Sequence, residues 1–158
     1  MTPGLTPSQT VGPYLSIGLE HEPGRVADPD GIAIAGQVLD GEGSPIPDAL
    51  VEVLQADGAA FARSPTDDDG AWSVRVPAPK PNGDQAPHCV VLVFARGLLL
   101  HLVTRVYLPD HAEQNATDPV LALVPADRRD TLLAERADDG YRFDIRIQGP
   151  GETVFFDV

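Results

Sequence analysis

Prolines and glycines recur along the whole chain and leave little room for long helices. The 158 residues include 16 prolines and 15 glycines, which divide the sequence into short segments. Proline removes a backbone donor and glycine favours tight turns, so this spacing is typical of many strands joined by turns. The sequence therefore predicts an all-β fold.

Several of these segments alternate apolar and polar residues, as a strand with one buried face does. In one of them, Trp72, Val74 and Val76 occupy every second position. The same alternation occurs over residues 98–108 and 141–148. Each of the three segments is therefore expected to form a strand.

Shorter signals complete the expected fold. Residues 32–40 and 49–55 flank a turn-rich segment and are expected to pair as a hairpin. Residues 127–136 follow a proline and carry an apolar edge, which predicts one short helix, and residues 153–157 are expected to form a closing strand. Together these signals predict a β-sandwich of about seven to eight strands.

The size and charge of the chain limit the domain organisation and the partners that are possible. A length of 158 residues suits one domain, which we place at residues 32–158, with residues 1–31 as an N-terminal arm. Eleven basic residues against 24 acidic ones give a net charge of −13, which repels nucleic acids and anionic membranes. The single cysteine, Cys89, cannot close an intrachain disulfide, and no apolar signal segment is evident, so we expect a cytoplasmic protein.

One histidine stands where half of a metal site would be. In a strand, side chains at i and i+2 share a face and lie about 7 Å apart, so a His-x-His pair can bind one ion. His88 is followed at that spacing by Val90, which has no donor atom. The residues alone allow two interpretations, a hydrogen-bonded structural histidine or a metal ligand.

The other histidines do not supply the missing ligand. His101 and Tyr107 share a strand face, but six residues at about 3.3 Å each separate them by roughly 20 Å. His21 and His111 lie in expected loops, with no ligand-type neighbour at a useful spacing. The sequence therefore does not predict a self-contained metal site.

Two other features could contact a ligand or a partner. Arg96 precedes Gly97 at a junction between expected strands, where a guanidinium can bind a carboxylate bidentately or remain a surface charge. Residues 6–14 are too rich in proline and glycine for a helix. Tyr14 within them could anchor the arm against this domain or against a neighbour.

These features, taken with the surrounding sequence, resemble one enzyme family. The run Thr6-Pro7-Ser8-Gln9-Thr10-Val11-Gly12-Pro13-Tyr14 resembles the TPSQT-x-GP-[YF] opening of intradiol ring-cleavage dioxygenases, and residues 36–40 and 51–57 resemble their GxVxD…EVWQAD hairpin. Further similar segments lie at residues 86–88, 94–97, 101–107, 141–149 and 152–157. The resemblance covers most of the chain and implies a β-sandwich.

Within that family, the similar segments are those of an alpha subunit that lacks iron. The resemblance implies a homologous beta subunit that binds Fe(III) through two tyrosines and two histidines and pairs with the alpha subunit in a hetero-oligomer. It implies the reaction of 3,4-dihydroxybenzoate (protocatechuate) with dioxygen to give 3-carboxy-cis,cis-muconate. No catalytic residue and no cofactor is then expected in this chain itself.

Matched position by position, most of the iron ligands are missing. His88 matches the first histidine, Val90 replaces the second, Phe61 stands at the first tyrosine, and no tyrosine occurs over residues 79–81. Phenolate oxygens suit ferric iron, and phenylalanine offers none. The resemblance therefore marks His88 as the remnant of a ligand set, with Gln85 near the position of a catalytic arginine.

The resemblance places the substrate pocket where the alpha and beta subunits meet. Thr10, Gly12, Pro13 and Tyr14 match alpha-subunit residues that border this pocket, and Arg96 matches an arginine near the bound aromatic acid. A local cation can attract an anionic substrate even when the net charge is negative. These five residues form the expected substrate-binding set, and the arm is expected to contribute to the partner interface.

Two alternatives remain at this point. One is a catalytically idle binding or scaffold sandwich that kept the fold but lost its partner. The other is an iron enzyme acting alone, with His88, His101 and Tyr107 as unusual ligands. The chain is also shorter than family members within residues 22–31 and 61–67, which is expected to affect assembly or the edge of the pocket.

Overall fold

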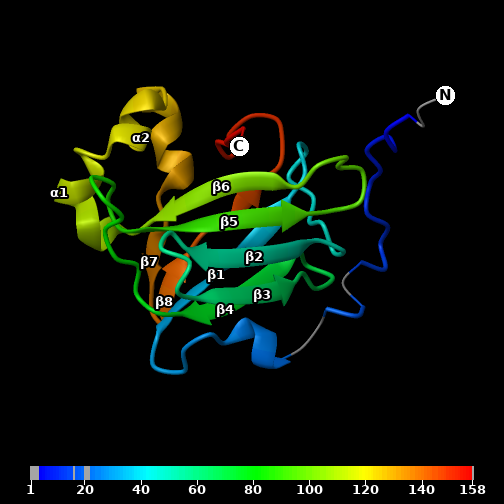
Figure 1. The fold of residues 1–158 in the computed structure, drawn as a ribbon, viewed down its shortest axis with the longest axis horizontal. Helices are drawn as coiled ribbons and strands as arrows, with labels where there is room; N and C mark the ends of the chain where they lie inside the picture. The colour runs from blue at the N-terminus through cyan, green and yellow to red at the C-terminus, as the bar shows by residue number, and fades with distance from the viewer. Residues whose placement is uncertain (1–3, 16, 20–21, 158) are drawn as a thin grey trace.

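Two β-sheets make up the body of the molecule (Figure 1). The computed structural model describes residues 4–15, 17–19 and 22–157, and within them nine strands form the sheets. One sheet has the order β4-β1-β8-β7, with β9 also paired to β1, and the other has the order β3-β2-β5-β6. The predicted β-sandwich is confirmed.

The elements are short, as the punctuation by proline and glycine predicts. The first sheet contains β1 (Ile32–Leu39), β4 (Ala71–Val76), β7 (Glu135–Ala137), β8 (Gly140–Arg142) and β9 (Ile145–Arg146). The second sheet contains β2 (Leu50–Gln55), β3 (Phe61–Pro65), β5 (His88–Phe94) and β6 (Leu102–Tyr107). The helical segments are η1 (Glu22–Arg25), η2 (Pro109–His111), α1 (Ala112–Asn115), α2 (Pro119–Leu123) and η3 (Ala126–Leu132).

The core lies between the sheets and is built from alternate residues of their strands. Trp72, Val74 and Val76 of β4 are at most 3% exposed, as their period-2 pattern predicts. They share one apolar cluster with residues of the opposite sheet, such as Val53 and Val91. Full burial of an aliphatic side chain contributes about 1.5–3 kcal/mol, so this cluster fixes which face of each strand turns inward.

The expected hairpin over residues 32–40 and 49–55 is wrong. β1 pairs with β4, β8 and β9, whereas β2 pairs with β3 and β5 in the opposite sheet. After Pro45, the N–H of Ile46 donates to Val38 O at 2.9 Å and folds the loop back onto β1. Because a proline offers no donor for a continuing ladder, the chain crosses to the other sheet instead.

The expected helix over residues 127–136 is only partly present. The 3-10 helix η3 ends at Leu132, and the edge strand β7 begins at Glu135. The N–H of Ala134 donates to Tyr107 O at 2.9 Å, which holds the chain in extended geometry against β6. The preceding helices α1 and α2, with four and five residues, are too short to leave a helical pattern in the sequence.

The last expected strands are shorter than their patterns suggest. The pattern over residues 141–148 splits into β8 and β9 because Asp144 Oδ1 accepts the N–H of Gln37 at 3.0 Å, in place of a backbone carbonyl. The expected closing strand over residues 153–157 forms no strand. It is held along β6 by the N–H of Phe156, which donates to Val103 O at 2.8 Å.

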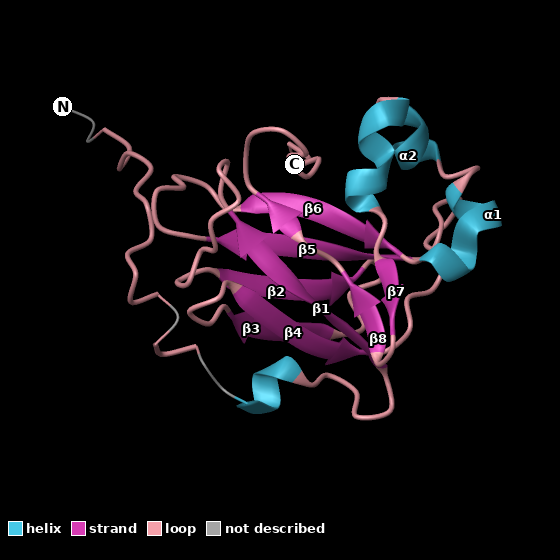
Figure 2. Ribbon diagram, turned by 180° about the vertical axis from the view of Figure 1, so that it is seen from behind, coloured by secondary structure: helices cyan, strands magenta, loops and turns pink. Residues whose placement is uncertain are grey.

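The N-terminal arm and the helices α1 and α2 lie at opposite ends of the sandwich (Figures 1 and 2). The described arm residues 4–15 and 17–19 contain no helix or strand and run past the turn between β5 and β6. Val26 forms a bridge with Arg75 of β4, so the division at residue 31 stays a prediction. No helix in the described ranges is long and apolar enough to cross a membrane.

A substitution at Gly36 tests the close approach between β1 and the segment after β8. A Cβ at this position would lie 1.9 Å from Phe143 O, a backbone atom. We expect Gly36→Ala to lower the free energy of unfolding by about 2 kcal/mol or more, measured by urea denaturation. Gly18→Ala is the control, because nothing lies within 4 Å of its Cβ. Equal stability of the two variants would contradict this packing.

Candidate functional site

The candidate residues lie at the two ends of β5. His88 begins this strand, and Arg96 follows two residues after its last residue, Phe94. Eight residues at about 3.3 Å each place His88 and Arg96 roughly 26 Å apart. The molecule therefore has two separate candidate regions that cannot contact the same small ligand.

Three of the four positions that the resemblance assigned to iron ligands share one face of the second sheet. Phe61 lies opposite Leu54, and Leu54 lies opposite Val90, in the registers of β2 with β3 and with β5. Val90 and His88 are two residues apart on β5 and so point to the same side. The fold therefore brings these positions to one surface, although their residues differ from the ligand set.

The side chains at these positions do not fit a ferric ion. Phe61 and Val90 have no donor atoms. His88 is buried, its Nδ1 is bonded to Ala86 O at 2.8 Å, and burial lowers the pKa of its imidazole. In the described residues, no three His, Cys, Asp or Glu side chains are grouped closely enough to hold a metal.

The ring of Tyr107 lies beside that of His88, tilted by 32° and with ring centroids 5.2 Å apart, but Tyr107 belongs to a buried hydrogen-bond network. Its hydroxyl donates to Asp118 Oδ1 at 3.3 Å and accepts from Arg105 Nη1 at 3.2 Å. Burial raises the pKa of Tyr107 to about 12, which opposes the phenolate that a ferric ion would need. Arg105 also donates to Gln85 Oε1 at 2.8 Å, so these polar groups bond to one another.

Asp118 is the centre of this network. It is 1% exposed, and its carboxylate accepts the N–H groups of Ala86 at 2.7 Å, Val120 at 2.9 Å and Leu121 at 2.8 Å. It therefore caps α2 and ties the segment before β5 to that helix. Sequence reasoning missed Asp118, although an aspartate directly before Pro119 is a recognisable helix-start signal.

The alternative iron site of His88, His101 and Tyr107 does not form. The ring of His101 stacks on Phe94, at a centroid distance of 5.2 Å, near the end of β5. His88 and Tyr107 face each other at the opposite end of β5 and β6. The length of β5 therefore separates His101 from the other two residues.

The remaining residues named from the sequence add no reactive group. Cys89 faces the core, and burial raises the pKa of its thiol to about 12, so it acts as a small hydrophobe. His111 ends the 3-10 helix η2. His21 lies outside the described residues.

At the other end of β5, the structure brings Thr10 to Gly97, the residue next to Arg96. The N–H of Gly97 donates to Thr10 Oγ1 at 2.7 Å, so the arm is tied to the turn that carries Arg96 (Figure 1). Gly97 has a φ of +92°, which glycine adopts readily. Arg96 is 61% exposed, and its Nε lies 3.1 Å from Oδ2 of Asp48, a residue that the sequence did not single out.

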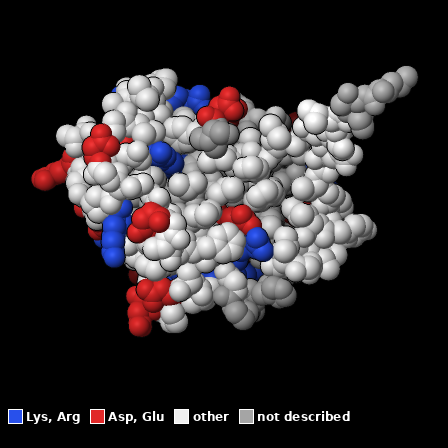
Figure 3. Space-filling model, in the orientation of Figure 1, with Lys and Arg blue, Asp and Glu red and all other residues white. Residues whose placement is uncertain are grey.

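The other expected substrate-binding residues lie on the exposed part of the arm. Gly12 O accepts the N–H of Leu15 at 3.1 Å and closes a turn around Pro13 and Tyr14. Gly12, Pro13 and Tyr14 are all exposed, Tyr14 to 77%. Residues 4–15 and 17–19 of the arm contain no charged residue, and Figure 3 shows this side of the molecule as largely white. Their role in substrate binding stays a prediction.

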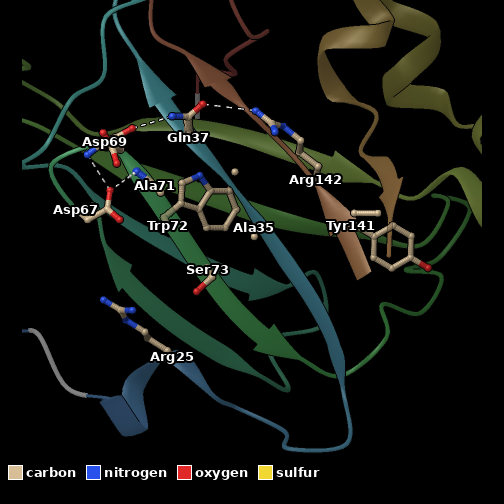
Figure 4. Close-up of a pocket in the computed structure, with 12 residues that line it drawn as sticks. Arg25, Ala35, Gln37, Asp67, Asp69, Ala71, Trp72, Ser73, Tyr141 and Arg142 are labelled. Atoms are coloured by element: carbon tan, nitrogen blue, oxygen red, sulfur yellow. Dashed lines mark hydrogen bonds between the residues drawn. The ribbon is translucent and has the colours of Figure 1, made fainter. Parts of the chain in front are cut away.

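A cavity of about 700 Å³ lies away from these residues, on the outer face of the first sheet (Figure 4). Gln37 and Arg142 line it, and the expected substrate-binding residues do not. Where the arm meets the turn after β5, Val11 and Leu98 line a hollow of about 30 Å³. Small-molecule sites usually measure roughly 300–1,000 Å³, so this hollow does not enclose an aromatic ligand.

Two relatives are similar to this chain over nearly its whole length. Protocatechuate 3,4-dioxygenase alpha chain from Burkholderia cepacia is 44% identical and covers 97% of both chains. The protein of the same name from Pseudomonas putida is 42% identical and covers 96% of both chains. The chain belongs to the family of protocatechuate 3,4-dioxygenase alpha chains. The resemblance to intradiol ring-cleavage dioxygenases is thereby confirmed.

Solved structures share the fold of this alpha-chain family member. The dioxygenase domain of a dioxygenase carbohydrate-binding protein fusion from Streptomyces sp. SirexAA-E is 21% identical, with a TM-score of 0.63 over 80% of this chain and 88% of that one. No family model matches the chain. The alignment with the Burkholderia cepacia protein spans 191 positions against the 158 residues of this chain, as expected for a shortened family member.

Removing the Asp118 carboxylate should destabilise the network at the start of β5. We expect Asp118→Ala to lower the free energy of unfolding by about 3 kcal/mol, because a helix cap is lost and the Ala86 N–H and Tyr107 hydroxyl lose their acceptor. Urea denaturation measures the loss. Asp138→Ala, exposed between β7 and β8, is the control and should cost less than about 0.5 kcal/mol. Equal losses would contradict the central place of Asp118.

Burial of His88 should lower the free energy of unfolding in mild acid. Below the ordinary pKa of 6.5, the unfolded chain binds a proton that the buried imidazole does not, so the free energy of unfolding falls as the pH falls. Between pH 7.5 and 5.5, urea denaturation should show the natural chain losing about 1 kcal/mol more than His88→Gln. Above pH 7.5, the free energies of unfolding of the natural chain and of His88→Gln should change with pH in parallel. Identical acid dependence of both chains would show that His88 is not protected from protonation.

Proposed function

We propose that this chain is the iron-free alpha subunit of a protocatechuate 3,4-dioxygenase, in which a homologous beta subunit holds Fe(III). The assembled enzyme converts 3,4-dihydroxybenzoate and dioxygen to 3-carboxy-cis,cis-muconate. One observation carries the proposal. The N–H of Gly97, next to Arg96, donates to the hydroxyl of Thr10, 87 residues away along the chain. This contact occurs in a chain that is 44% identical to an alpha chain of that name.

The surface around Arg96 supports a pocket that another chain completes. Leu99 and Leu100 of the turn are 60% and 72% exposed, and Tyr14 of the arm is 77% exposed. Exposed apolar side chains near a cation are typical of a protein–protein interface. A beta subunit that packs here would cover these side chains and supply the walls that the 30 Å³ hollow lacks.

In such a pocket, the residues of this chain bind and orient the substrate. The guanidinium of Arg96 is always charged and matches a carboxylate in geometry, so it attracts the carboxylate of 3,4-dihydroxybenzoate. Thr10 holds the turn that carries Arg96, and Gly12, Pro13 and Tyr14 form part of the wall. The ferric ion of the partner activates the catechol toward dioxygen when it is bound. The contribution of the alpha chain is affinity and orientation.

Co-expression with a homologous beta chain tests the assembly. We propose a cytoplasmic location, so both chains are produced in the cytoplasm of one bacterial host. They are expected to co-elute in size exclusion, and full activity, followed as dioxygen uptake with 3,4-dihydroxybenzoate, is expected to require both. An alpha chain that neither binds the beta chain nor changes its activity would overturn the proposal in favour of an idle scaffold.

Kinetics of an Arg96 variant test the role of the cation. Arg96→Ala should raise the KM of the assembled enzyme for 3,4-dihydroxybenzoate about tenfold, because the loss of one charge-assisted contact costs about 1.4 kcal/mol. The kcat should change less, since the proposed iron lies on the other chain. Arg142→Gln, exposed on the other sheet, is the control. An unchanged KM for Arg96→Ala would remove Arg96 from the pocket.

A further inference from the structure

Asp48 and Arg96 lie in turns that adjoin the paired ends of β2 and β5. The ladder between these strands ends at Leu50 opposite Phe94, two residues from Asp48 and from Arg96. The distance between Arg96 Nε and Asp48 Oδ2 is 3.1 Å. The end of the ladder therefore brings the two turns, and with them the ion pair, close together.

The carboxylate of Asp48 is shielded from solvent. Its side chain is 12% exposed, and both oxygens are buried. Neither oxygen accepts a hydrogen bond from the described residues, so the 3.1 Å contact with Arg96 is an ion pair without hydrogen-bond alignment. A buried carboxylate is destabilised unless a cation lies beside it. The burial of Asp48 thus favours conformations in which the guanidinium of Arg96 stays at this place.

Hydrogen-bonded or buried backbone adjoins both residues of the pair. On one side, the N–H of Ala49 donates to Thr66 Oγ1 at 2.9 Å, and the Ala49 carbonyl accepts the N–H of Thr66 at 2.9 Å. On the other side, Ala95 is 1% exposed and Gly97 is bonded to the arm. The backbone next to Asp48 and next to Arg96 is therefore held in place, which limits the movement of both side chains.

We propose that Asp48 is a positioning residue for Arg96. It contacts Nε, the nitrogen nearest the stem of the side chain, while the side chain of Arg96 remains 61% exposed. The outer nitrogens of the guanidinium are thereby turned toward the partner-formed pocket, where the planar fork binds a carboxylate through two hydrogen bonds. This inference rests on the proposed function, because Arg96 must have a substrate carboxylate to bind.

Kinetics of the assembled enzyme test the positioning role. Asp48→Asn keeps the shape of the side chain, removes its charge, and should raise the KM for 3,4-dihydroxybenzoate about fivefold with little change in kcat. In an Arg96→Gln background, Asp48→Asn should have no further effect on KM, because Asp48 acts through Arg96. Glu42→Gln is the matched control. It removes the same charge from the same connection between β1 and β2 and should leave KM unchanged.

Stability gives a second readout that does not depend on the substrate. Arg96→Gln should lower the thermal midpoint of the complex, and the added Asp48→Asn should recover part of the loss, because the double variant no longer buries an unpaired carboxylate. A double variant that recovers nothing would contradict the ion pair.

The kinetic outcomes separate the two proposals. If Arg96→Gln raises the KM while Asp48→Asn leaves it unchanged, the positioning role of Asp48 is overturned and the proposed function stands. If Arg96→Gln also leaves the KM unchanged, the substrate role of Arg96 fails, and the positioning role fails with it.

Discussion

The antiparallel register of β2 with β5 decides where the candidate residues lie. It pairs Leu50 with Phe94, which sets Val90 and His88, at positions that the resemblance assigned to iron ligands, at one end of the outer face and Arg96 at the other. Because side chains alternate, a slip of one residue would turn both groups into the core. Buried residues of the inner face, such as Val53 and Val91, hold the register. The packing that stabilises the sandwich therefore also fixes the geometry of the proposed pocket.

At the start of β5, a polar network stands where the resemblance places a metal. The carboxylate of Asp118 joins α2, the segment before β5 and the hydroxyl of Tyr107. These groups would otherwise be buried without a partner, and a charge-assisted hydrogen bond satisfies each of them. His88 fits beside this network as a buried imidazole whose pKa is lowered by burial. This end of the strand is therefore structural, and Thr10 and Arg96 lie at the other end.

Local patterns could be predicted from the sequence, and long-range partners could not. The alternation around Trp72 indicates directly which residues are buried. Strand β4 could therefore be predicted from it, and patterns of this kind predicted the sandwich. Whether β1 pairs with β2 depends on the sheet to which each strand belongs. No local sequence pattern indicates that sheet. Thr10 and Arg96 followed from the resemblance, and the structure brings their segments together. Asp48 could not be predicted because its partner depends on strand register, and Asp118 was missed because the helix that it caps has five residues.

The iron content of the assembled enzyme tests the central claim most directly. Metal analysis of the purified alpha–beta complex, with both chains quantified, should give one iron for each alpha–beta pair and none in the purified alpha chain. Two irons for each pair would contradict the account. A visible tyrosinate-to-iron charge-transfer band in the purified alpha chain would contradict it equally, because it would show a ferric site built from the residues of this chain.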